Sequence, residues 1–420
     1  MSIRRTEFES GLRLVSESMP SVRSVALGFW VLVGSRDESS RISGSSHFLE
    51  HLLFKGTKSR SARDIAEAFD AVGGDVNAFT AKEYTCFYAR VRDRDLPMAV
   101  ECLCDMLQRS TLRSPNVDGE RRVILEEINV HEDTPDDLIH DLFTETLWPD
   151  HPLGRPILGT AESIKAATRD QIHRFYRKHY VPGNLVIVAA GNVQHEDLLD
   201  LIGSHMQTGR IRTEDGPSGR NLRQVGDPPR PSGRTVVKRR KIEQAHICIG
   251  TNGLSRQDPD RFAFGIVNTA LGGGLSSRLF QEIREKRSLA YSVYSYHSMF
   301  AEAGLFCAYA GTAPAHAKEV LDLVRRELDD VAEGGLTEVE FERARGHMKG
   351  SLALSLEEPS GRMSRLGKSE ISHGEILTVN QILRRIEAAT LEDAHRAAER
   401  VLGQPAALTV LGPLGKGALS

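Results

Sequence analysis

Residues 209–234, GRIRTEDGPSGRNLRQVGDPPRPSGR, divide this chain of 420 residues into two parts of similar length. The stretch is rich in Gly, Pro and Arg and lacks periodic apolar spacing, which predicts an exposed linker. A chain of this length is also too long for one ordinary hydrophobic core. We therefore expect two domains, residues 1–218 and residues 219–420.

The two parts repeat one order of elements. Each is predicted to begin with an apolar strand and a helix, to continue with a second strand and an amphipathic helix, and to end with a charged helix followed by a closing helix and strand. The expected elements are residues 24–34, 45 onward, 84–91, 95–107, 117–130, 164–180 and 184–193 in the first part, and 245–251, 261–271, 304–311, 315–331, 339–356 and 391–415 in the second.

This order lacks a strict βαβ rhythm, and the strands show both alternating and fully apolar patterns. The fold class that we predict is α+β, with two homologous α/β sandwich domains, each a sheet with helices packed mainly on one face. Duplication of one ancestral domain explains the repeated order. The alternative is chance similarity between two α+β domains.

The composition excludes several classes of protein. Hydrophobic residues make up 40% and charged residues 26%, a balance typical of globular chains. The net charge of −3 gives no basic surface for nucleic acid or an anionic membrane. No apolar stretch approaches the roughly 18 residues that a membrane span needs. No apolar core follows the two arginines near the N-terminus, so we expect no secretory signal. Five scattered cysteines, including the pair C-x-C at 102 and 104, favour reduced thiols in the cytoplasm.

The most informative motif is His47-Phe48-Leu49-Glu50-His51. On a helix, His47 and His51 project from the same face one turn apart, which suits two imidazoles on one metal ion. Glu50 can then reach a water at the metal without being a ligand, as a general base must. The alternative is an amphipathic helix with two surface or core histidines. Two histidines with an acid between them favour the metal site.

A catalytic zinc also needs a third protein ligand. Residues 116–133, NVDGERRVILEEINVHED, offer five donors on a predicted helix: Glu120, Glu126, Glu127, His131 and Glu132.

A helical projection separates these donors. Val123, Ile124 and Ile128 mark the expected buried stripe, and Glu127 and Glu120 fall within its arc, whereas Glu126 falls outside it. A carboxylate in an apolar stripe is costly unless a cation or strong donor meets it. We therefore predict Glu127 as the third ligand, close to both imidazoles, and Glu120 as a group that orients a histidine. The alternative is an acidic, solvated helix.

The second part has no equivalent of this motif. In RFAFGIVNTALGGG, residues 261–274, no histidine or carboxylate occurs after Arg261. The glycine-rich residues 272–277 lack the lysine and context of a P-loop, so we expect no phosphate site. The second domain must therefore wall off a cavity, bind substrate or form a dimer.

H-x-x-E-H is the inverzincin signature, the inverted order of H-E-x-x-H. With Glu127 following 76 residues after His51, the chain resembles the pitrilysin-like zinc peptidases and is similar to their short bacterial members and to the mitochondrial processing peptidase β subunit. The phrases that carry the resemblance span nearly the whole chain: HFLEHLLFKGT, AVGGDVNAFTAKEYTCFYA, HPLGRPILGT and REKRSLAYSVYS.

This resemblance implies a duplicated, processing-peptidase-like metallohydrolase fold and a zinc metalloendopeptidase. By resemblance, His47, His51 and Glu127 would hold one Zn²⁺ per chain, Glu50 would activate the water, and Glu120 would match the family's additional acidic position. The expected substrate is a peptide or an unfolded polypeptide segment.

Two further pairs of residues are assigned by resemblance alone. Asn77 and Ala78 match the family's edge strand, which binds substrate backbone by β-augmentation; the alternative is an ordinary turn leading into a strand. Arg284 and Tyr291 match the family's arginine–tyrosine pair, in which the arginine would hold the substrate and the tyrosine would donate to the oxyanion; the alternative is a helix-end arginine and a packed tyrosine.

Members of this length resemble half of a clamshell, so the resemblance implies a dimer, either a homodimer or a heterodimer, in which Arg284 and Tyr291 would serve the partner subunit's zinc site. Two other functions remain as alternatives: a non-catalytic peptide-binding or scaffolding subunit of a heterodimeric processing peptidase, and a zinc hydrolase acting on other substrates. Filled ligand positions and an intact arginine–tyrosine pair argue against the non-catalytic subunit.

Overall fold

A computed structural model describes residues 3–212, 226–372 and 376–419. The described chain forms two compact units, and neither is one continuous segment. The first comprises residues up to 129, 156–224 and 355–376, and the second comprises 130–155, 225–354 and 377–420. The expected domain boundary between residues 218 and 219 lies outside the described residues. No helix in the described ranges combines the length and the apolar character needed to cross a bilayer.

The first unit contains a six-stranded sheet in the order β1-β2-β6-β3-β5-β4. Its strands are β1 (Ile3–Glu7), β2 (Arg13–Ser18), β3 (Ser24–Val31), β4 (Asp75–Thr80), β5 (Thr85–Arg92) and β6 (Leu185–Gly191). Its helices are α1 (Ser45–Leu53), α2 (Ala62–Asp70), α3 (Leu96–Arg109), α4 (Ser114–Glu132, of which 130–132 belong to the second unit), α6 (Ala161–Ala166), α7 (Arg169–His179), α8 (His195–His205) and α12 (Pro359–Ser372).

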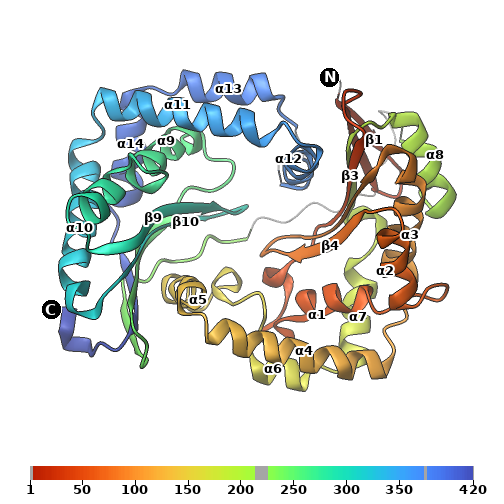
Figure 1. The fold of residues 1–420 in the computed structure, drawn as a ribbon, viewed down its shortest axis with the longest axis horizontal. Coiled ribbons are helices and arrows are strands. Elements are labelled where there is room, and N and C mark those ends of the chain that lie inside the picture. Colours follow the sequence, from red (N-terminus) through yellow and green to blue (C-terminus); the bar gives the residue numbers. More distant parts are fainter. Residues whose placement is uncertain (1–2, 213–225, 373–375, 420) are drawn as a thin grey trace. The chain divides into compact units, whose positions relative to one another are not determined.

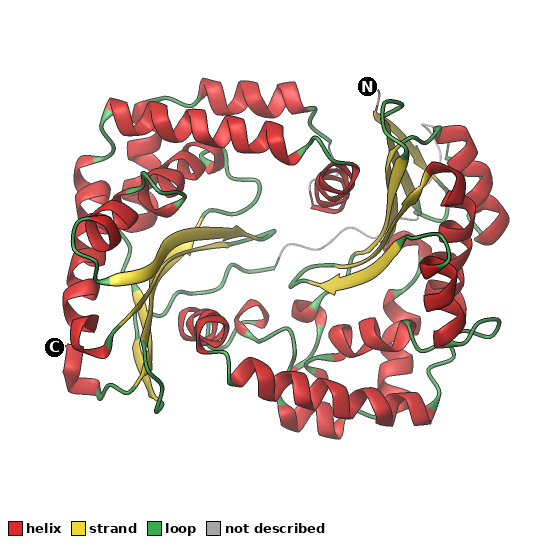
Figure 2. Ribbon diagram, in the orientation of Figure 1, coloured by secondary structure: helices red, strands yellow, loops and turns green. Residues whose placement is uncertain are grey.

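The second unit contains a five-stranded sheet in the order β7-β11-β8-β10-β9. Its strands are β7 (Thr235–Arg239), β8 (Ala245–Gly253), β9 (Ala290–Met299), β10 (Gly304–Thr312) and β11 (Ala407–Gly412). Its helices are α5 (Pro135–Leu147), α9 (Arg261–Gly272), the π-helix η6 (Phe280–Glu285), α10 (Ala317–Gly334), α11 (Glu338–Ser355, whose last residue belongs to the first unit), α13 (Val379–Ala388) and α14 (Leu391–Leu402). Helices and a mixed sheet in each unit confirm the α+β class (Figure 2).

The central strands of the first unit's sheet are buried on both faces. One face packs against α3 and α8, and the other against α12 (Figure 1). Strands covered on both sides have nearly continuous apolar sequences, and every residue of β6 is buried. The close packing of α12 depends on Gly367, because an added Cβ there would lie 2.1 Å from Cε2 of Trp30 on β3. Most helices of this unit therefore pack on one face of the sheet, as the sequence predicts, and α12 covers the other face.

In each unit, the helix on the second face comes from the other half of the sequence. The helix α5 precedes the 209–234 stretch and packs on β8 and β11 of the second unit, whereas α12 follows that stretch and packs on β3 and β6 of the first. The two halves of the chain thus exchange one helix each.

One predicted element is wrong in detail. The helix expected over residues 164–180 is two helices, α6 and α7. The interruption has a local cause: the Thr168 hydroxyl accepts the backbone N–H of Gln171, and the Gln171 side chain accepts the N–H of Thr168. This reciprocal capping box starts a new helix at Arg169.

Candidate metal centre

The helix α1 begins at a buried carboxylate. Glu38, 3% exposed, accepts the backbone N–H groups of Gly44 and Ser46 at 2.7 and 2.6 Å. Gly44 has φ 89°, a conformation that glycine adopts readily. A carboxylate at a helix N-terminus satisfies free N–H groups and is favoured by the helix dipole. These contacts fix the first turn of α1, which carries His47.

Two imidazoles and one carboxylate meet between α1 and α4. The ring centroids of His47 and His51 lie 4.6 Å apart. The Glu127 carboxylate faces both rings, with Oε1 at 3.6 Å from His47 Nε2 and Oε2 at 3.5 Å from His51 Nε2. One ligand atom from each residue can be chosen so that all three lie within 4.8 Å of one another. The structure thus brings together the three residues predicted as metal ligands.

These spacings fit a divalent ion. Nitrogen and oxygen ligands at about 2.0–2.1 Å from a tetrahedral zinc lie about 3.3 Å from each other. The distances of 3.5 and 3.6 Å between Glu127 oxygens and the Nε2 atoms of the two rings are close to this ligand–ligand distance, and they are long for hydrogen bonds. A set of two nitrogens and one carboxylate oxygen is also one that catalytic zinc sites use.

The protonation of His47 suits a ligand. Burial, assisted by the neighbouring His51, lowers the pKa of His47 to about 4. The ring is therefore neutral at pH 7 and carries a lone pair that can bind a metal.

Glu120 orients the second histidine. This residue is 7% exposed, its Oε2 lies 3.2 Å from His51 Nδ1, and its Oε1 lies 2.8 Å from Lys55 Nζ. Because Nδ1 is occupied by Glu120, Nε2 of His51 is left to face Glu127. Lys55 compensates the buried charge and was not singled out from the sequence, although it follows His51 by four residues.

We expect Glu120→Gln to weaken zinc binding by about 10–100-fold, the usual cost of losing a carboxylate that orients a histidine ligand. Competition with a coloured chelator measures the affinity. Glu126→Gln is the matched control, because Glu126 is an exposed glutamate on the same helix. Equal zinc affinities of the two variants would contradict a positioning role for Glu120.

The buried stripe of α4 differs from the expected one. Ile124 and Ile128 are buried, but Val123 is 49% exposed, so its inclusion was wrong. The side chain of Glu127 is 42% exposed, which leaves room beside the three donors. The candidates that were not chosen lie elsewhere: Glu126 is exposed, His131 pairs with Asp141 at 3.1 Å, and Glu132 pairs with Arg240 at 3.4 Å.

Glu50 is tied to the edge of the sheet. The hydroxyl of Thr80, the last residue of β4, donates to Glu50 Oε2 at 2.5 Å. Burial raises the pKa of Glu50 and the charge of Glu127 adds to this, whereas Thr80 and His51 oppose it. Thr80 was not singled out from the sequence, although it lies two residues after Ala78 on the same strand.

Asn77 and Ala78 lie on β4, the last strand in the order of the first sheet. They pair with Tyr88 and Phe87 of β5 on one side. The backbone N–H of Ala78 donates to Oδ1 of Asn77 at 2.8 Å. That donor is therefore directed away from β5, toward the open edge of the strand.

Arg284 and Tyr291 are in contact within the second unit. Arg284 Nη1 donates to the backbone carbonyl of Tyr291 at 2.9 Å, and its guanidinium carbon lies 4.8 Å from the centre of the Tyr291 ring. The Tyr291 side chain is otherwise open, since the residue is 78% exposed. Arg284 thus lies in the last turn of η6, which agrees with the alternative of a helix-end arginine, whereas Tyr291 is not a packed tyrosine.

Comparison with known families gives two matches, one to the first part of the chain and one to the part that follows it. Residues 13–161 match the profile of "Insulinase (Peptidase family M16)", which includes the candidate metal centre. Residues 166–348 match the profile of the "Peptidase M16 inactive domain", which includes Arg284 and Tyr291.

Relatives of similar length are described as uncharacterized zinc proteases. One from Streptomyces coelicolor is 51% identical over 413 residues, covering 98% of this chain and 90% of its own. One from Mycobacterium tuberculosis is 44% identical over 414 residues, covering 98% and 93%. One from Bacillus subtilis is 38% identical over 416 residues, covering 98% and 99%.

Two solved structures have the same fold. A protease from Helicobacter pylori superimposes with a TM-score of 0.87 at 21% identity, covering 98% of this chain and 99% of its own. A peptidase M16 inactive domain from Pseudomonas fluorescens superimposes with a TM-score of 0.90 at 21% identity, covering 99% and 98%.

Proposed function

The chain belongs to peptidase family M16, and from that premise we propose that it is a zinc-dependent endopeptidase that hydrolyses peptides or unfolded polypeptide segments. The observation that carries this proposal is the group of His47, His51 and Glu127, whose donor atoms lie within 4.8 Å of one another. Glu50 comes from the same helix as the two histidines and stands beside this group.

One Zn²⁺ held by His47, His51 and Glu127 would polarise the scissile carbonyl and acidify water. Glu50 accepts the proton of the attacking water and delivers it to the leaving amine. Thr80 holds one carboxylate oxygen of Glu50 by its hydrogen bond, so the other oxygen remains for proton transfer. Glu120 keeps the His51 ring oriented.

The substrate backbone pairs with the open edge of β4. Ala78 offers its N–H there once the Asn77 side chain turns away. Main-chain pairing supplies affinity without demanding a particular sequence, which suits a peptidase of unfolded segments. Because Thr80 is on the same strand, a bound peptide lies in register with Glu50.

Arg284 and Tyr291 act on the substrate and on the oxyanion. Arg284 orients Tyr291 through the contact with its carbonyl and ring, and the exposed phenol is free to donate a hydrogen bond. We propose a homodimer, in which this pair serves the partner subunit's centre. We also propose a cytoplasmic location, which suits five free and buried cysteines.

Mass spectrometry of a mixed digest of unfolded peptides, incubated with the protein with and without chelator, tests this function. We expect internal peptide bonds to be cleaved, cleavage to stop with chelator, and activity to return with added zinc. Intact peptides that nevertheless co-purify with the protein would instead support a non-catalytic peptide-binding subunit. Molar mass in solution, measured on the same sample, tests the homodimer.

A further inference from the structure

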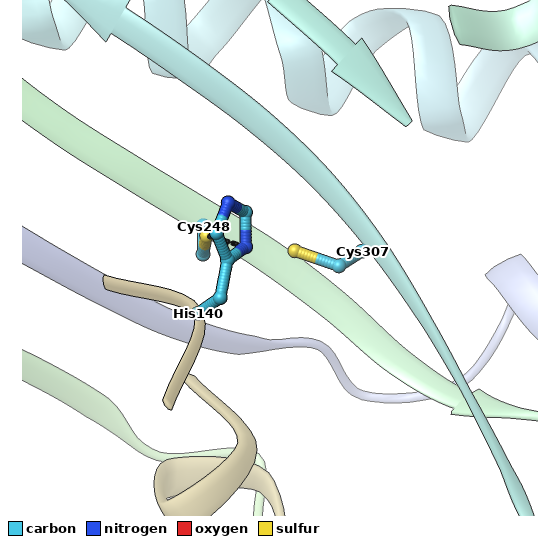
Figure 3. A group of neighbouring side chains, drawn as sticks. All are labelled: His140, Cys248 and Cys307. Carbon is cyan, nitrogen blue, oxygen red and sulfur yellow. Dashed lines mark hydrogen bonds between the residues drawn. The ribbon is translucent and has the colours of Figure 1, made fainter. Parts of the chain in front are cut away.

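A second group of metal-binding side chains lies inside the second unit. His140 comes from α5, Cys248 from β8 and Cys307 from β10, and their donor atoms lie within 4.8 Å of one another (Figure 3). Both cysteines are fully buried, and His140 is partly buried. This group shares no residue with the candidate metal centre and has no role in the proposed peptidase reaction.

The sheet register explains why the two thiols point the same way. Cys248 is paired with Tyr309, and Cys307 is paired with Gly250, so the cysteines are diagonal neighbours on one face. The helix α5 covers this face. Gly250 permits its close approach, because an added Cβ would lie 2.9 Å from Cζ of Phe143 on α5. The helix α5 therefore places the His140 ring next to the two sulfur atoms.

We propose that His140, Cys248 and Cys307 form a binding site for a thiophilic divalent cation, and Zn²⁺ is the ion that we expect there. Two thiolates and one imidazole are a donor set that zinc sites use, with the thiols giving up their protons on binding. Nitrogen at about 2.0–2.1 Å and sulfur at about 2.3 Å from a tetrahedral zinc lie about 3.5–3.6 Å apart. Cys248 Sγ and His140 Nδ1 are 3.6 Å apart.

The surroundings complete a metal site of this kind. His140 Nε2 lies 2.9 Å from the Tyr294 hydroxyl, a contact that holds the ring while Nδ1 faces the sulfurs. The Tyr296 hydroxyl lies 2.8 Å from Nδ1 and also contacts the Cys307 thiol. When Nδ1 binds a cation, this hydroxyl keeps its contact with Cys307 and donates to the thiolate.

A pocket lies next to the residues that surround this group. A pocket of about 640 Å³ in the second unit is lined by Tyr294 and Tyr309, which both lie against the His140 ring. Three carboxylates also line this pocket: Asp136, Asp137 and Glu243. Their negative charge raises the local concentration of cations in this pocket.

The bound cation would fasten α5 to the sheet. The helix belongs to the first half of the sequence and both cysteines belong to the second, and the sequence separation of His140 and Cys248 is 108. A link between such distant segments stabilises the unit that contains both. The competing view is a polar cluster in which His140 is satisfied by two tyrosine hydroxyls alone.

Cobalt substitution tests the site, because Co²⁺ bound to thiolate gives an intense near-ultraviolet charge-transfer band, which histidine and carboxylate ligands do not give. The full-length protein is freed of metal and titrated with CoCl₂ under a non-thiol reductant. We expect this band in the wild type once both proposed sites are filled, and in His47→Ala, where one equivalent of Co²⁺ suffices. Absence of the band in the wild type overturns the proposal.

Three variants locate the band. Cys248→Ser and Cys307→Ser should each weaken it strongly, whereas Cys104→Ser, which changes a buried cysteine of the first unit, should leave it unchanged. Near-ultraviolet circular dichroism checks that each variant is folded. A band that survives in both Cys248→Ser and Cys307→Ser overturns the assignment. Because the readout is optical, an inactive peptidase does not affect it, and its failure leaves the peptidase proposal intact.

Discussion

Glu50→Gln is expected to lower kcat by about 10²–10⁴-fold, the usual contribution of a general acid–base, while zinc content stays at the wild-type value. The amide cannot accept the proton of the attacking water, but it has nearly the same shape and can still accept the Thr80 hydrogen bond. Steady-state kinetics on a peptide found in the digest, together with atomic absorption, measures both quantities.

Glu126→Gln is the control for this variant, because it removes the same charge from an exposed position on α4 that lies outside the metal centre. Its activity should match the wild type. Unchanged turnover in Glu50→Gln would exclude Glu50 as the base, and loss of zinc in that variant would show that the carboxylate binds the metal instead.

His47→Ala is expected to lose one equivalent of zinc per chain and the peptidase activity with it. The Nε2 atom of His47 is one of three donor atoms that the described residues bring together at the centre, and the low pKa of the ring leaves it neutral and able to bind the metal. A metal ion supplies several kcal/mol of transition-state stabilisation. Each 1.36 kcal/mol is tenfold in rate, so activity should fall by about 10³-fold or more.

His316→Ala is a suitable control, since that histidine is 49% exposed and lies in the second unit. Thermal melting of both variants separates loss of metal from loss of fold. Retention of a full equivalent of zinc at this centre in His47→Ala, judged by activity and metal content together, would contradict the ligand assignment. The cobalt–thiolate band provides an independent count of the second site.

The sequence predicted most elements because local rules specify them. Apolar runs with period 2 or 3.6 located β3, β5, β8 and α3 to within a few residues. The miss over residues 164–180 also has a local cause, since Thr168 and Gln171 form a capping box that an unbroken apolar period conceals. Val123 was wrong for another reason: an apolar residue on a helix is buried only if another element covers that face.

At the candidate metal centre, the pairing of His47 with His51 follows from helix geometry, so spacing alone predicts it. The sequence did not identify Glu38, Lys55 and Thr80 as parts of this centre. Their roles depend on the residues that they contact in the folded chain. A capping carboxylate could have been suspected from the helix start at Gly44, but any of several nearby acids would have served. Thr80 depends on β4 lying beside α1, which is a tertiary contact.

The sequence by itself determined the local features of this protein: the α+β elements, the H-x-x-E-H helix and the long helix that carries Glu127, the third predicted ligand. These depend on residues at most two or three helical turns apart, whose relative positions a single helix or strand dictates. Only the tertiary structure decided the exchange of α5 and α12 between the two units and the meeting of His140 with Cys248 and Cys307. Those contacts join residues far apart in the chain, and no period in the sequence encodes which faces will cover each other.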